Sequence, residues 1–486
     1  MQEFALARSI VIWCGSSKLS WSDTYNVLTL LVESATMSFI MGFKDIARGE
    51  GSPYRFGRVG LCRKTCQRGW ARVTYFIDAN WDIGRQRSGD ELEALHFHMF
   101  VYDTLKMVRA LRASDDKDKI FSIIGITEHL RPIGSTPIIQ PNYDLSTEQI
   151  YKSFAFALIQ RLPSLILLSS VEDREYRGRS KLPSWTPDYT FQAVTFAELA
   201  VVTAYCKYKP TGYLEYYHQP RLLDNTLTLH GFPIDVVTAT SLASCVDLAR
   251  VVEWQNPTWL EYLRSILTLA DPACLSAHYN SPAPVVLGRT LIADAVAYKP
   301  APDSIDSSFY SWLVCCFTTS ADFGKVNGGP GSPQWNFMEG AVLKAIQQLV
   351  SGRVTPLWAG LLAEIGRLGV PLGYDDWVNS GGRMAILRHE EKESAFNSEI
   401  SATNAGRKLF RTSKGLLGLG ARSVKEGDVV WAIENAQMAM VLRPSRPGAI
   451  DGLMEFMGDA YLHGCMRGEM FEALAVDRVV REVNIV

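Results

Sequence analysis

Four side chains that could support covalent catalysis lie close together near the end of the chain. They are Asp459, His463, Cys465 and Glu469. An acid, a histidine and a thiol are the residue types of a nucleophile activated by a general base, as in a hydrolase. On one β-strand, residues two apart share a face but lie about 7 Å apart, beyond hydrogen-bond reach without a bend. We therefore keep these four as candidates for catalysis, with a buried polar strand end as the alternative.

A second pattern suggests zinc ligands at first sight. Cys62 and Cys66 are followed by His96 and His98. The two histidines lie two positions apart on a predicted helix, where their side chains point to nearly opposite faces and do not converge on one ion. The sequence therefore predicts no metal site.

The glycine-rich stretch 415–420 is superficially similar to a phosphate-binding loop. It reads Gly-Leu-Leu-Gly-Leu-Gly. No helix with a free N-terminus is predicted to follow it, and the surrounding pattern indicates hairpins. These glycines are therefore predicted to be structural, and we expect no cofactor.

The elements that must position these residues include a series of short strands. Strands are predicted at 408–412, 416–419, 429–434, 438–442 and 454–462. Their regular spacing, with glycine and charged residues between them, is typical of a small antiparallel barrel or meander. The final residues, 471–486, are expected to pack back on the body as a helix or strand. Further strands are predicted upstream at 9–15, 165–171, 182–189 and 226–240.

Helical periodicity accounts for much of the remaining chain, so the predicted fold class is α+β. Ser146 to Gln149 form a capping-box pattern that precedes a helix at 147–161. Acidic residues at 115–118 precede a short helix that Gly125 can end in a left-handed conformation. Other helices are predicted at 22–40, 90–112, 247–270, 288–297, 307–320 and 335–400.

The composition argues against several kinds of partner. Among 486 residues there are 49 Lys and Arg against 51 Asp and Glu, which gives a formal net charge of −2. Such a balance provides no field that favours nucleic acid or an anionic membrane. The nine cysteines are scattered without framework spacing, and Glu3 is unsuited to a signal peptide. We expect a soluble cytoplasmic protein with no membrane span and no nucleic-acid partner.

Two groups of segments carry a resemblance to a known family. The first group lies at 113–126, 141–144, 182–188 and 227–235, and the second at 407–415, 427–430, 441–444 and 458–469. Their order resembles that of the fungal heterokaryon-incompatibility (HET) domain family. The second group resembles the family's terminal β module. The residues that carry the resemblance are Gln2, Glu3, Asp116, Asp118, Lys119, Gly125, Pro183, Trp185, Pro187, Gly231, Asp235, Gly427, Asp428, Arg443, Pro444, Gly458, Tyr461, His463, Gly464, Gly468 and Glu469.

Two features depart from the family pattern. Lys117 stands where the family usually has arginine. The family's N-terminal domain, with its Leu-Ser-Tyr-x-Trp-Gly strand, would precede Gln2. That domain is an α/β unit distantly similar to TIR domains, some of which hydrolyse NAD, and no residue of such a site can be carried onto this sequence. We therefore expect residues 1–20 to be a remnant of that domain, with a strand at 10–13 that lacks its neighbours.

The predicted elements and the resemblance together divide the chain into four regions. These are the remnant at 1–20, a mixed α/β middle at 21–245, a mainly helical region at 246–400 and a small β-rich module at 401–486. The resemblance implies an intracellular protein of non-self recognition, in which a non-self partner triggers growth arrest or programmed cell death. This chain would be the regulatory or scaffold body, with protein partners but without the effector domain. The alternatives are a hydrolase-type enzyme that uses the four clustered residues, and a truncated, non-functional product.

Overall fold

The computed structural model describes a short N-terminal hairpin and much of the ranges 89–312 and 396–486. The described residues are 11–14, 17–20, 89–109, 113–176, 181–190, 198–212, 218–243, 262, 265–271, 273–306, 308–309, 312, 396–445, 452–469 and 479–486. Gln2, Glu3, Cys62 and Cys66 lie outside these ranges, as does most of the helical block expected between 247 and 400. The mixture of helices with a largely antiparallel sheet confirms the predicted α+β class.

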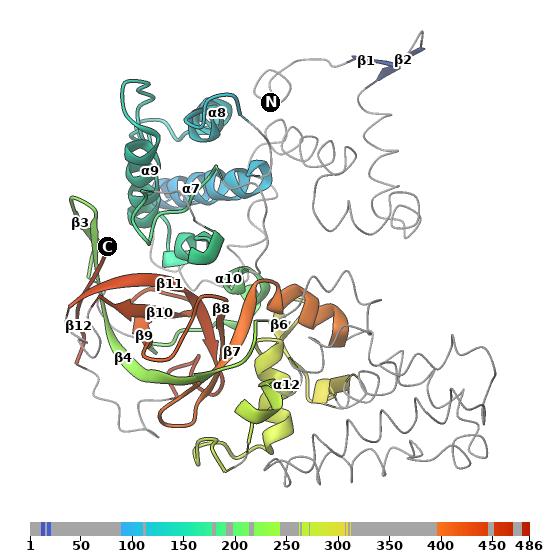
Figure 1. The fold of residues 1–486 in the computed structure, drawn as a ribbon. Coiled ribbons are helices and arrows are strands. Elements are labelled where there is room, and N and C mark those ends of the chain that lie inside the picture. The colour runs from blue at the N-terminus through green and yellow to red at the C-terminus, as the bar shows by residue number, and fades with distance from the viewer. Residues whose placement is uncertain are drawn as a thin grey trace.

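Three helices form a layer on one side of the molecule (Figure 1). They are α7 (Gly89–Val108), α8 (Asp118–Thr127) and α9 (Thr147–Arg161). The capping box that starts α9 is confirmed: Ser146 Oγ accepts a hydrogen bond from the Gln149 N–H, and the Gln149 side chain accepts one from the Ser146 N–H. Phe154, with no exposed surface, lies on the buried face of α9.

The helix α8 continues through Gly125 instead of ending there, which corrects the prediction. Its C-cap is Glu128, whose backbone is helical and whose N–H bonds to the Ile124 carbonyl. Ile123 and Ile126 are fully buried on either side of the glycine. Burial of such side chains contributes about 1.5–3 kcal/mol each, which outweighs the roughly 1 kcal/mol cost of a glycine inside a helix.

Two segments predicted as strands fold differently. Residues Leu165–Ser170 form a 3-10 helix, η4, and 182–189 form turns. Ser164 Oγ accepts a hydrogen bond from the Ile166 N–H and starts η4, whose six residues are all buried. A short buried run that is mostly apolar does not distinguish a buried strand from a short buried helix. In 182–189, two prolines lack the N–H groups that a strand ladder requires.

The C-terminal strands form a barrel with strands from the middle of the chain. All the strands predicted between 408 and 462 are present. The eight strands are β3 (Arg221–Leu223), β4 (Thr226–Thr240), β7 (Arg407–Thr412), β8 (Leu417–Ala421), β9 (Val429–Ile433), β10 (Ala439–Pro444), β11 (Leu453–Leu462) and β12 (Arg481–Ile485). Their order is β10-β9-β4-β12-β11-β8-β7, with β3 beside β4. Additional pairings of β10 with β11 and of β4 with β7 close the sheet.

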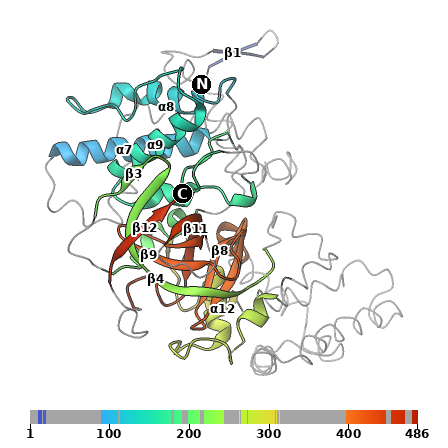
Figure 2. The same cartoon turned by 60° about the vertical axis from the view of Figure 1, so that its left-hand side comes forward.

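The long strand β4 holds this barrel together. Figure 2 shows it curving around the other strands. Its first part pairs with β3 and β12, its middle pairs with β9, and its last residues pair with β7. Register shifts at Pro233/Asp235 and Val237/Ala239 allow the bend. The barrel therefore joins residues from the predicted middle region to those of the predicted C-terminal module, while the region boundaries themselves stay predictions.

Smaller elements surround the barrel. The helix α12 packs against β8 on the side away from the helical layer (Figure 1). The elements are η3 (Glu128–Leu130), η5 (Arg174–Tyr176), α10 (Leu199–Val202), η6 (Ala204–Cys206), α12 (Ala283–Leu291), β5 (Ala295–Val296) and β6 (Lys299–Pro300). One continuous cluster of buried apolar side chains connects the helical layer with the barrel interior.

The N-terminal strand is present but is not isolated. Residues Val11–Cys14 form β1, which pairs antiparallel with β2 (Ser17–Ser20). The expectation of a strand without neighbours was therefore wrong, because β2 pairs with it along its whole length.

Across the described ranges, none of the helices combines the length and the apolar character required to cross a bilayer.

Candidate functional site

The four clustered candidates at the end of β11 do not bond to one another through their side chains. Asp459 lies on β11 and forms a buried ion pair with Arg407 of β7, at 2.5 Å between Nη2 and Oδ1. Glu469 accepts a hydrogen bond from the Arg467 N–H at 2.6 Å. Both carboxylates therefore have partners other than His463 and Cys465.

The His463 ring lies in a pocket of tyrosines. Its Nδ1 is 3.0 Å from the Tyr461 hydroxyl, and the Tyr279 ring meets it edge-on, with ring centroids 5.3 Å apart. The Tyr279 hydroxyl donates to the His463 carbonyl and accepts from the Leu417 N–H. Burial, with a smaller effect from Arg289, lowers the pKa of His463 from 6.5 to about 4. The imidazole is therefore neutral near pH 7 and is bonded within the barrel.

The thiol of Cys465 points to the backbone instead of to a base. Its Sγ donates to the His463 carbonyl at 3.4 Å, and the residue is fully buried. Burial raises the pKa of Cys465 well above its usual value, with smaller contributions from nearby acids. A protonated, buried thiol is a poor nucleophile. The geometry thus provides no relay from Asp459 through His463 to Cys465.

Two motifs of the β module are joined by an ion pair. Asp428 follows Gly427 at the start of β9, and Arg443 lies near the end of β10. The guanidinium contacts both carboxylate oxygens, with Nε to Oδ1 at 2.7 Å and Nη2 to Oδ2 at 2.9 Å. Asp428 Oδ2 also accepts from the Lys425 N–H, while Gly427 adopts φ +88° at the turn. These contacts join the start of β9 to the end of β10, at the end of this strand pair away from the connection between the two strands.

Other resemblance motifs also make contacts that hold the fold. Asp235 of β4 accepts hydrogen bonds from Ser413 Oγ at 2.5 Å and from the Lys414 N–H at 2.7 Å. An added Cβ at Gly231 would lie only 2.3 Å from the Ala432 carbonyl oxygen, so a side chain there would separate β4 from β9. In the helical layer, Asp118 accepts from the Tyr143 hydroxyl at 2.6 Å, which joins the 113–126 and 141–144 segments.

The segment 182–188 attaches to the barrel at the junction of β11 and β12. Ser184 Oγ accepts from the Phe456 N–H, and the Ser184 N–H donates to the Val486 carbonyl at 2.9 Å. Trp185 is fully buried, and its Nε1–H donates to the Asn225 carbonyl. This motif therefore connects the helical layer to the barrel.

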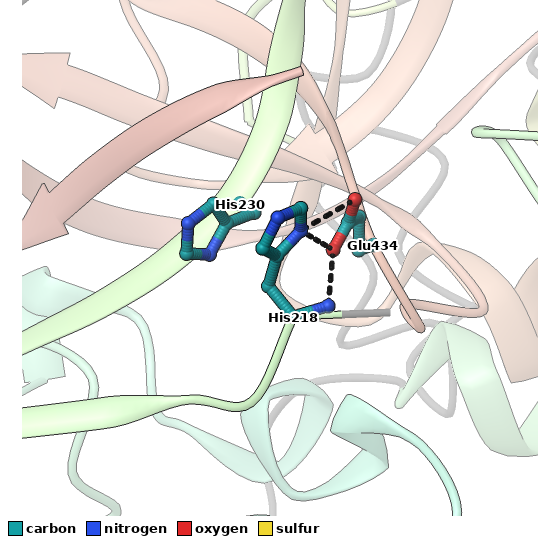
Figure 3. A group of neighbouring side chains, drawn as sticks. All are labelled: His218, His230 and Glu434. Atoms are coloured by element: carbon teal, nitrogen blue, oxygen red, sulfur yellow. Dashed lines mark hydrogen bonds and ion pairs between the residues drawn. The ribbon is translucent and has the colours of Figure 1, made fainter. Parts of the chain in front are cut away.

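A cluster that the sequence analysis missed consists of His218, His230 and Glu434 (Figure 3). His230 lies on β4, Glu434 directly follows β9, and His218 lies just before β3. One nitrogen or oxygen atom from each side chain lies within 4.8 Å of those of the other two. These residue types are metal ligands, so this is the group among the described residues that could hold an ion.

Hydrogen bonds and stacking hold the cluster together. His218 Nδ1 lies 3.0 Å from Glu434 Oε2, and the His218 backbone N–H donates to the same oxygen at 2.9 Å. The two imidazoles are stacked, with ring centroids 4.0 Å apart. Neither His218 nor Glu434 belongs to a local motif, and strand pairing alone brings distant residues together here. No spacing in the sequence could have revealed the cluster.

Comparison with known proteins identifies the C-terminal part of the chain. Residues 376–478 match the family model of the Het-6 beta-barrel domain, a C-terminal region of fungal HET-type proteins. The resemblance noted in the sequence of this region is therefore confirmed. The match includes β7 to β11 and ends before β12, while β3 and β4 lie upstream of it. No curated protein and no solved structure matches the chain.

Proposed function

We propose that this chain is the regulatory or scaffold body of a fungal HET-family protein that acts in non-self recognition in the cytoplasm. The observation that supports the proposal is the Het-6 beta-barrel match at 376–478. Strands from both sides of the matched range complete this barrel, so it forms one framework with the rest of the described chain.

The resemblance residues fit a framework role. Asp428 bonds to Arg443, Asp235 to Ser413, and Asp118 to Tyr143. Because these side chains bond to other segments of the fold, recognition falls to exposed loops. The loop between α8 and α9 presents Ile133, a large apolar side chain that a protein partner could cover.

The experiment that tests this proposal is deletion of the gene in the fungus that carries it, followed by pairing with a panel of isolates. We expect at least one incompatible pairing to become compatible, and re-expression of the chain to restore the incompatibility. If the deletion changes no pairing, the proposal is wrong.

A variant separates the scaffold function from the hydrolase alternative. Cys465→Ala removes the only thiol among the four clustered candidates with a small change of volume. On the scaffold proposal, this variant restores incompatibility as the unmodified chain does. Restoration by the unmodified chain but not by Cys465→Ala at equal protein level would favour the hydrolase instead.

A further inference from the structure

We propose that His218, His230 and Glu434 form a zinc site with one open coordination position. Two imidazoles and one carboxylate are a ligand set typical of zinc sites that retain an exchangeable fourth ligand. The inference goes beyond the proposed scaffold function and depends only on the geometry of the cluster (Figure 3).

Accepting the ion requires the ligand atoms of the cluster to adjust their separations and the stacked His218 ring to turn. With ligands at about 2.0–2.2 Å from a tetrahedral zinc, neighbouring ligand atoms lie roughly 3.3 Å apart. His218 Nδ1 and Glu434 Oε2 are already 3.0 Å apart, and no pair of ligand atoms exceeds 4.8 Å. The side chain of His218 is 55% exposed, so its ring can turn towards the other two ligands without displacing the core.

His230 is arranged as a metal-binding histidine would be. Among the described residues, its buried Nδ1 has no hydrogen-bond partner, whereas Nε2 lies 3.6 Å from Glu482 Oε1. A histidine that binds metal through one nitrogen commonly directs the other towards a carboxylate, which fixes the ring. Nδ1 is therefore the ligand atom.

Glu434 supplies the negative charge. Its side chain is only 4% exposed, and the hydrogen bonds that its carboxylate accepts in the described structure come from His218. Burial of a carboxylate is costly, and a divalent cation would offset that cost. The backbone already holds the ligands in place, because the Glu434 N–H donates to the His230 carbonyl at 2.8 Å. A bound ion would connect β4, the end of β9 and the segment before β3.

The test measures metal binding by the full chain after treatment with a chelator. Zinc sulfate is titrated into the unmodified protein and into His218→Ala, Glu434→Gln and the control His278→Ala. His278 is a half-buried histidine that contacts Tyr279, away from the cluster. Circular dichroism checks that each variant folds. Because the His218 side chain is exposed, His218→Ala is the cluster variant whose substitution disturbs core packing least. Cobalt substitution then reports whether thiolates bind the metal.

We expect one zinc ion per chain, affinity lowered roughly tenfold or more by His218→Ala and Glu434→Gln, and unchanged affinity in His278→Ala. The cobalt-loaded protein should show a tetrahedral spectrum without a thiolate charge-transfer band. The proposal is overturned if the unmodified chain binds no zinc, if both cluster variants bind it as tightly, or if the cobalt spectrum shows thiolate ligands.

Discussion

His463 is the candidate general base among the four clustered residues, and its contacts in the structure are those of a structural residue. A general base must reach the proton it removes and must have a pKa near the working pH. Here the ring bonds to Tyr461, the backbone carbonyl bonds to Tyr279, and burial moves the pKa away from neutrality. These contacts favour a role for His463 in stability, which makes a prediction about acid.

We predict that His463 makes the protein less stable as the pH falls from 6.5 towards 4. Its pKa is about 4 in the folded chain and 6.5 in the unfolded chain, so between these values the unfolded state binds more protons. The stabilisation is complete above 6.5 and is lost as the pH falls through 4; it amounts to about 3 kcal/mol. Urea unfolding at pH 7 and pH 4.5 should therefore show a smaller loss of stability in His463→Gln than in the unmodified chain. Equal losses in the two proteins would contradict this role. His98, whose pKa is also lowered to about 4, is present in both and cancels.

At the scale of elements, the attachment of the start of β9 to the end of β10 depends on the Asp428–Arg443 pair. The Asp428 side chain is 1% exposed and that of Arg443 is 18% exposed. Removing Asp428 leaves the largely buried Arg443 guanidinium with the Ser423 carbonyl but without its carboxylate partner, and breaking a buried pair typically costs 3–5 kcal/mol. We predict that Asp428→Ala lowers the free energy of unfolding by about 3 kcal/mol or more.

A surface pair provides the control for this prediction. Glu128 and Arg131 form an exposed pair at 2.7 Å, and Glu128→Ala should cost less than about 1 kcal/mol. Urea unfolding of both variants gives the comparison. Similar losses of unfolding free energy in Asp428→Ala and Glu128→Ala would show that the contact between β9 and β10 does not depend on this buried pair.

Elements that local sequence signals define were predicted correctly. The prediction failed where contacts between residues far apart in the sequence determine the structure. The capping box at Ser146 marked the start of α9, and glycine turns such as Gly427 separated the barrel strands. Leu165–Ser170 was assigned to a strand on its pattern of β-branched and apolar residues, and it is a 3-10 helix. The strand at 226–240 was predicted, but its pairing with β7, β9 and β12 was not. Pairing between strands far apart in the chain produces no periodic pattern in the sequence. The His218 cluster was missed for the same reason.

At the scale of the whole molecule, the barrel extends beyond the matched domain. The family match ends at 478, whereas β12 lies at 481–485 and β4 at 226–240. In the strand order, β4 lies between β9 and β12 and also pairs with β7. Without β4, four strands lose a main-chain partner, and their apolar faces become exposed.

We therefore predict that residues 376–486 expressed alone do not form the native barrel, whereas residues 221–486 do. The shorter fragment keeps β7 to β12 but lacks β4, so the unpaired edges of β9 and β12 should make it aggregate or expose it to protease. The measurement is limited proteolysis and near-ultraviolet circular dichroism of both fragments. Adding a peptide of residues 221–243 to the shorter fragment supplies β3 and β4 and should restore protection. A protease-resistant, cooperatively unfolding 376–486 would show instead that the C-terminal module is an independent domain, as its predicted boundary at 401 implies, and that β4 only covers it.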